Sequence, residues 1–125
     1  MTDERLVKIR KLVIPVMRIL NLINSEEEEK LNEIPLGLIR KNATRMHAVC
    51  RFKPGPKGYS KSINDVKEVA LHPEALNDEW LHYAKFLMFH EYLHAIGNIR
   101  HDSVFRELES LWPDENAKNS GKEFG

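Results

Sequence analysis

Cysteine is almost absent from this chain of 125 residues, in which Cys50 is the only one. A lone cysteine excludes an intrachain disulfide and is typical of proteins from a reducing compartment. Cys50 belongs to an alternating apolar pattern, so we expect a buried, unreactive thiol and neither a nucleophile nor a metal ligand. We therefore expect a cytoplasmic protein.

Long apolar runs and an excess of one charge are also missing. No stretch approaches the roughly 18 apolar residues of a membrane span, and the N-terminus is unlike a signal peptide. The chain has 19 basic and 19 acidic residues, and 42% of its residues are hydrophobic, which is ordinary for a globular protein. We expect one domain over residues 1–113, no membrane association, and a flexible polar tail over residues 114–125.

An HExxH motif at residues 90–94 is the strongest chemical signal that the chain contains. On a helix, His90 and His94 lie one turn apart on the same face, where both can bind one Zn²⁺. Glu91 can then hold and deprotonate a water molecule. His101 follows His94 by seven residues and would be a third ligand, leaving the fourth position open as in catalytic zinc sites. The pattern predicts a zinc hydrolase, most plausibly a peptidase.

The third ligand has alternatives. A metzincin would have its third histidine at position 100, where this chain has Arg100. A gluzincin takes a glutamate from the following helix, and Glu107 or Glu109 could serve. We favour His101, because it is nearer and histidine is a good zinc ligand.

The chain resembles the SprT-like metallopeptidase domain, in which HExxH is followed by a short spacer, then His-Gly or His-Asp and an aromatic residue. Here His101-Asp102 precedes Phe105, and residues 69–76 resemble the family's passage from strand to helix. The resemblance covers residues 34–113, and WLM metallopeptidase domains, which carry His-Asp-x-x-Phe, are a close second. It implies His90, His94 and His101 as ligands and Glu91 as general base.

Hydrophobic periodicity predicts an α+β domain with an N-terminal helix, a small three-stranded sheet, a zinc helix and a closing helix. The predicted ranges are 3–23 for the first helix, 34–72 for the sheet, 78–96 for the zinc helix and 102–112 for the closing helix. Ser25 with the glutamates after it is either a helix cap or a linker. The apolar face of helix 3–23 either packs on the sheet or mediates dimerisation, so the oligomeric state stays open.

Basic residues gather between positions 40 and 67 and could bind DNA phosphates or form a solvated face of the sheet. The candidates for nucleic-acid contact are Arg45, Arg51, Lys53, Lys57 and Lys61. The SprT-like resemblance implies action on DNA-associated proteins. An exposed sheet edge could also align flexible or unfolded protein segments as substrates.

Two other functions stay open at this point. A small-molecule zinc hydrolase would have a deep, closed pocket, and a nucleic-acid-binding module with a structural zinc would have four protein ligands. Tyr83, Tyr92 and Arg100 are unranked candidates for stabilising an oxyanion. We expect His47, His72 and His82 to be structural or exposed.

Overall fold

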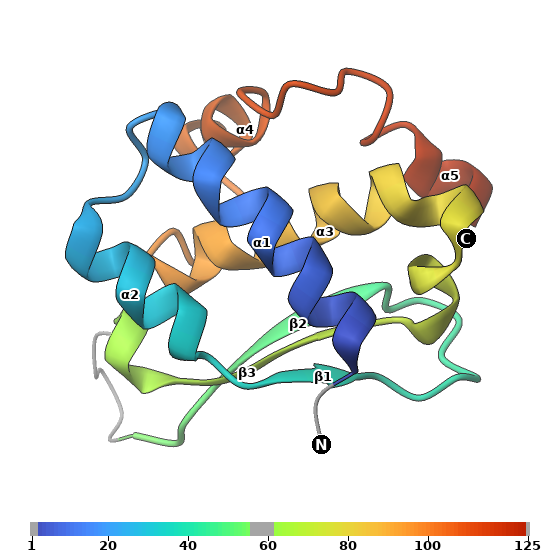
Figure 1. Ribbon diagram of the computed structural model, residues 1–125, viewed down its shortest axis with the longest axis horizontal. Helices are drawn as coiled ribbons and strands as arrows, with labels where there is room; N and C mark the ends of the chain where they lie inside the picture. The colour runs from blue at the N-terminus through green and yellow to red at the C-terminus, as the bar shows by residue number, and fades with distance from the viewer. Residues whose placement is uncertain (1–2, 56–61, 125) are drawn as a thin grey trace.

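The computed structural model describes residues 3–55 and 62–124, which form the predicted α+β fold. Figure 1 shows a small sheet with the helices gathered on one side of it. The elements are α1 (Glu4–Ile19), α2 (Ser25–Glu33), β1 (Leu36–Leu38), β2 (Ala48–Phe52), β3 (Val66–Leu71), α3 (Leu81–Ala95), α4 (Ser103–Glu109) and α5 (Ser120–Phe124). No helix in these described ranges is both long and apolar enough to cross a bilayer.

The sheet has the order β1-β3-β2, with β3 parallel to β1 and antiparallel to β2. Only β3 has a strand on both sides, which explains why Val69 and Leu71 are fully buried. Cys50 is opposite Val69 on the face that the helices cover. Arg51 is opposite Glu68 on the other face and forms an ion pair with it. Among the described residues, residues 48–51 of β2 pair with β3 on one side and with no strand on the other.

The first helix is shorter than predicted and is followed by a second one. Asn21 adopts a left-handed conformation with a φ of 62°, and the N–H of Leu22 donates to the carbonyl of Met17, which closes α1. Asn24 then begins α2 through a reciprocal capping box with Glu27. The expected single helix over 3–23 is therefore wrong at its end, and the glutamate-rich segment is helical.

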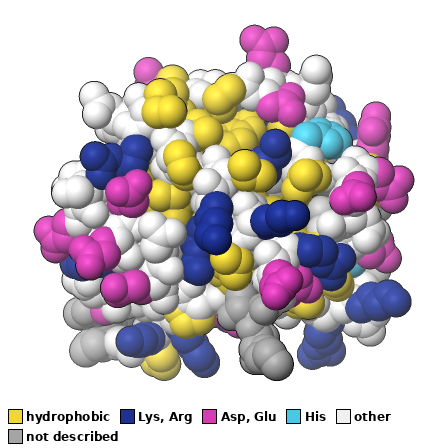
Figure 2. Space-filling view, viewed as in Figure 1, with side chains coloured by type: hydrophobic (Ala, Val, Ile, Leu, Met, Phe, Trp, Pro, Cys, Tyr) yellow, Lys and Arg dark blue, Asp and Glu magenta, His cyan; other side chains and the backbone are white. Residues whose placement is uncertain are grey.

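The apolar face of α1 belongs to the core and is not an external seam. Its buried side chains are Leu6, Ile9, Val13, Ile14 and Met17. Figure 2 shows hydrophobic side chains in the upper part of this view, above a region in which acidic and basic side chains are interspersed. Leu12 and Ile19 on the other side of α1 are exposed.

The zinc helix of the sequence prediction is α3, which is preceded by a short 3-10 turn at Asp78–Trp80. It packs against α1, β2 and β3, and most of its residues are buried. Gly97 ends it with a φ of 114°, and the N–H of Asn98 donates to the carbonyl of Leu93. These two features form a Schellman turn, in which glycine is favoured because it has no Cβ.

The closing helix α4 is capped by Asp102, whose side chain accepts the N–H of Phe105. Its buried positions are Phe105 and Glu109, followed by Trp112 beyond the helix. Val104 and Leu111, although apolar, lie outside this buried face and are 57% and 44% exposed. Phe105 sets the buried face of α4, because its ring packs against the three histidines described below.

Residues 114–124 pack on the domain, although the sequence predicted a flexible tail. Ala117 is fully buried, and Lys118 forms an ion pair with Glu109. Phe124 packs edge-on against Trp80 and His47, with ring centroids 5.0 and 4.9 Å away. These contacts are with distant segments, which is why local polarity suggested a solvated tail.

Substituting Phe124 tests this packing. Phe124→Ala should lower the free energy of unfolding by about 1 to 3 kcal/mol, because a half-buried aromatic ring loses its contacts. Glu123→Ala, at an exposed neighbouring position, should change it little. Urea titration followed by circular dichroism measures both, and equal small effects would show that the segment does not contribute to the fold.

Candidate metal centre

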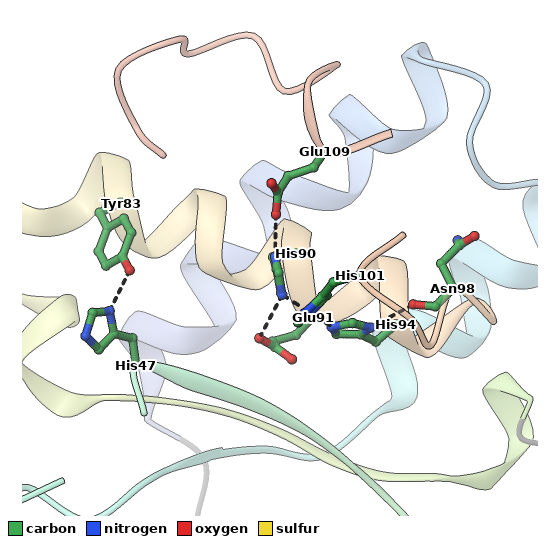
Figure 3. Close-up of polar contacts among 8 residues, drawn as sticks. All are labelled: His47, Tyr83, His90, Glu91, His94, Asn98, His101 and Glu109. Atoms are coloured by element: carbon green, nitrogen blue, oxygen red, sulfur yellow. Dashed lines mark hydrogen bonds and ion pairs between the residues drawn. The ribbon is translucent and has the colours of Figure 1, made fainter. Parts of the chain in front are cut away.

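The rings of His90, His94 and His101 converge on one point, as Figure 3 shows. The Nε2 atom of His94 lies 3.2 Å from that of His90 and 3.0 Å from that of His101. One ligand nitrogen from each residue lies within 4.8 Å of the others. Nitrogens that share one Zn²⁺ at about 2 Å lie roughly 3 to 3.5 Å apart. These three histidines are therefore close enough to bind one metal ion.

The other nitrogen of two rings is held by a hydrogen-bond acceptor. His90 Nδ1 donates to Glu109 Oε2 over 2.6 Å, and His94 Nδ1 donates to the backbone carbonyl of Asn98 over 2.7 Å. A carboxylate and a carbonyl only accept, so the protons of both neutral rings lie on Nδ1. The Nε2 lone pairs of His90 and His94 then face each other with no proton between them. A cation fits this arrangement, because it would bind the lone pairs that otherwise repel each other.

Two local features orient these rings. The Schellman turn at Gly97 brings the carbonyl of Asn98 back to His94. Phe105 lies against all three histidines, with ring centroids 4.7 to 5.0 Å away, and stacks on His94. Burial lowers the pKa of His94, and the neighbouring His90 and His101 lower it further. The carbonyl of Asn98 and the carboxylate of Glu109 raise the pKa but do not outweigh these effects. A lowered pKa keeps the ring neutral, which is the form that binds metals.

Glu91 lies beside the cluster, with its Oε2 4.0 Å from His90 Nε2. Burial raises its pKa to about 7, while His90 and the backbone N–H of Cys50 act in the opposite direction. A carboxyl group with this pKa exchanges a proton readily near neutral pH. The structure therefore puts a proton acceptor next to the candidate metal site.

Glu109 binds the back of His90 and is not part of the ligand cluster. It accepts from His90 Nδ1 and forms an ion pair with Lys118 Nζ over 3.1 Å. Burial raises its pKa, but the hydrogen bonds from His90 and Lys118 outweigh burial and bring the pKa to about 2. Glu107 is exposed. Neither glutamate is the third ligand of the gluzincin alternative, and sequence reasoning missed the orienting position of Glu109.

A cleft runs along β2 on both sides of Glu91. Two hollows of about 450 and 380 Å³ share Ala48, His90 and Glu91 as lining residues. One extends towards the N-terminal end of α3, and the other towards His101 and Ile99. This is an extended groove, which differs from the closed pocket expected of a small-molecule hydrolase.

Cys50 lines the cleft and is half-buried. Burial, with a smaller contribution from Glu91, raises the pKa of its thiol to about 12. The thiol therefore stays protonated at neutral pH, in line with the unreactive side chain expected from the sequence.

The candidates for oxyanion stabilisation lie in different places. Tyr83 lines the cleft and bonds through its hydroxyl to His47 Nδ1 over 2.6 Å. Tyr92 is fully buried, and its hydroxyl has no hydrogen-bond partner among the described residues, so it does not reach the cleft. Arg100 is exposed and lines a separate hollow.

The other two histidines serve structural contacts. His72 is buried, accepts from the N–H of Glu74 and donates to the carbonyl of Ala43. His82 bonds to Ser120 of the C-terminal segment.

The candidate nucleic-acid residues are divided among several environments. Arg45 and Arg51 line a hollow formed by residues 39–46, and Arg51 is paired with Glu68. Arg45 also lines the cleft beside Tyr83 and His90. The backbone N–H of Lys53 bonds to the carbonyl of Asp65. Lys57 and Lys61 lie outside the described residues. DNA binding by this segment stays a prediction.

Glu109 should be needed for tight metal binding. Glu109→Gln should weaken Zn²⁺ affinity about 10- to 100-fold, because the orienting carboxylate behind His90 is lost. Glu107→Gln, on an exposed position of the same helix, is the matched control and should bind Zn²⁺ like the wild type. Competition with a chromogenic chelator measures both affinities, and equal values would remove Glu109 from the metal site.

No protein-family model, curated protein or solved structure matches this chain. The resemblance to SprT-like and WLM metallopeptidase domains therefore rests on the motif residues alone and stays a prediction.

Proposed function

We propose that this protein is a zinc-dependent endopeptidase that cleaves flexible or unfolded protein segments. The observation that carries the proposal is the convergence of three histidine Nε2 atoms beside a buried carboxylate, at the middle of an extended cleft. Three nitrogen ligands suit Zn²⁺, and within the described ranges no fourth histidine, cysteine or carboxylate joins the cluster. This donor set favours a catalytic metal over a structural one.

Each protein group has a distinct part in the proposed hydrolysis. Zn²⁺ held by His90, His94 and His101 would supply Lewis acidity, which acidifies a water molecule and polarises the scissile carbonyl. Glu91 accepts the proton of that water as its oxygen bonds to the carbonyl carbon. Glu91 then gives the proton to the amine nitrogen as the C–N bond breaks. A pKa of about 7 suits both transfers, since the carboxyl group is neither a strong acid nor a strong base.

The outer edge of β2 at residues 48–51, which pairs with no strand among the described residues, supports a peptide as the substrate. This strand runs along the cleft, and its residues Ala48, Cys50 and Phe52 line it. An extended peptide can pair with such an edge through backbone hydrogen bonds, which requires a segment that is not already folded. The same requirement favours flexible or unfolded regions of proteins as substrates.

Glu91→Gln tests the proposed mechanism. The amide cannot accept a proton, so turnover should fall by about 10²- to 10⁴-fold, while zinc content and melting temperature stay close to those of the wild type. Cleavage of an unfolded casein, followed by mass spectrometry, measures turnover. Glu107→Gln serves as the exposed control and should cleave like the wild type.

Metal removal provides the second arm of this test. A chelator should abolish cleavage, and stoichiometric Zn²⁺ should restore it. Wild-type turnover by Glu91→Gln would exclude Glu91 as the base. A zinc-loaded wild type that cleaves no unfolded protein would contradict the peptidase proposal.

A further inference from the structure

The two ends of the cleft differ in chemistry. Towards His101 the walls beside the metal site are apolar and include Phe52, Ile99 and the protonated thiol of Cys50. Towards the N-terminal end of α3 the cleft is also lined by apolar side chains, but here Arg45, His47 and Tyr83 add a positive charge and hydrogen-bonding groups. A substrate that spans Glu91 meets both environments, so this asymmetry bears on which peptides bind.

The His47–Tyr83 pair retains a hydrogen-bond donor. Burial raises the pKa of Tyr83 to about 12, so its hydroxyl stays protonated. Burial, with the neighbouring His72, lowers the pKa of His47, which keeps the ring neutral at pH 7. The neutral ring and the hydroxyl carry one donor proton each, and the hydrogen bond between them uses one of the two. The second proton, on either the other ring nitrogen of His47 or the hydroxyl of Tyr83, can be donated to a ligand. Figure 3 shows this pair on the opposite side of His90 from His94.

The positive charge at this end comes from Arg45, whereas Glu91 and Glu109 are the carboxyl groups that line the same hollow. Arg45 is exposed, and no ion pair found among residues 3–55 and 62–124 includes it. The nearby carboxylate of Glu109 is already bound by His90 and Lys118. A guanidinium with a free hydrogen-bonding fork, next to a neutral donor pair, is suited to a carboxylate.

We propose that the end of the cleft formed by Arg45, His47 and Tyr83 binds a carboxylate of the peptide substrate, and that the opposite end takes an apolar side chain. The carboxylate belongs either to an Asp or Glu side chain or to a free C-terminus. This proposal rests on the peptidase function proposed above and narrows its substrate class.

The spacing of residues along α3 sets the distance between the proposed carboxylate site and the scissile bond. Tyr83 precedes His90 by seven residues, which is about 10 Å along a helix axis. An extended peptide advances by roughly 3.3 Å per residue. The carboxylate should therefore lie about three residues from the scissile bond, on the side directed towards Tyr83.

Matched peptides test this preference. Fluorogenic peptides with Asp or Asn at two to four residues on either side of the cleavage point should differ in kcat/KM. We expect Asp to be favoured about threefold to tenfold on one side only, which is the range for a partly exposed charge pair. The same peptides with free and amidated C-termini distinguish a terminal carboxylate from a side-chain carboxylate. Equal kcat/KM values across all of these pairs would overturn the proposal.

Variants of two arginines assign the effect to Arg45. Arg45→Gln should bring the ratio of Asp to Asn cleavage close to one, and Arg45→Glu should favour Lys at the same position. Arg40→Gln removes an exposed arginine that lies outside this cleft and should keep the wild-type ratio. A loss of preference as large in Arg40→Gln would show a general charge effect and contradict the assignment.

Binding to the Glu91→Gln variant separates this proposal from the proposed activity. Fluorescence anisotropy should show the same preference for the Asp peptide without turnover. Binding that depends on Arg45 in a protein that cleaves nothing would support the carboxylate site and contradict the peptidase function. Cleavage of Asp and Asn peptides at equal rates, with equal affinities, would support the peptidase function and contradict the carboxylate site.

Discussion

The hydrogen bonds that His90 and His94 donate from Nδ1 fix which nitrogen of each ring faces the other. With both protons turned outwards, two lone pairs meet at 3.2 Å, and His101 brings a third nitrogen to the same place. A cation between the nitrogens would remove the repulsion between these lone pairs. A metal ion bound there would be adjacent to the Glu91 carboxyl group, and the function that we propose depends on this neighbourhood.

The burial of α3 makes this arrangement accessible from one direction. Because α1 and the sheet cover most of the helix, His90, Glu91 and His94 reach the surface in a hollow beside β2. Glu91 is therefore largely desolvated, which raises its pKa to about 7. Packing thus supplies both the proton affinity of the carboxyl group and the direction of the cleft.

The C-terminal segment connects the two halves of the site. Lys118 neutralises Glu109 behind His90, and Phe124 packs against both His47 and Tyr83 at the other end of the cleft. A segment that is polar in sequence therefore supports a metal ligand and the hydrogen-bonding pair that we propose to contact substrate. Its contribution could not be predicted, because single apolar residues such as Phe124 and Ala117 reveal their contacts only in the folded chain.

The features that could be predicted from the sequence are those that depend on residues close together along the chain. Helical spacing brings His90 and His94 onto one face, Gly97 supplies the left-handed turn, and alternating side chains define the strands, so the α+β class and the motif were predictable. Contacts between distant segments decided the rest. They bring His101, and not Glu109, into the cluster with His90 and His94, and they place Arg45 and Tyr83 in the same hollow. The end of α1 at Asn21 was likewise not predicted. Spacing along the chain fixes neighbours within an element, whereas packing, loop paths and burial fix neighbours between elements, and these depend on the whole fold.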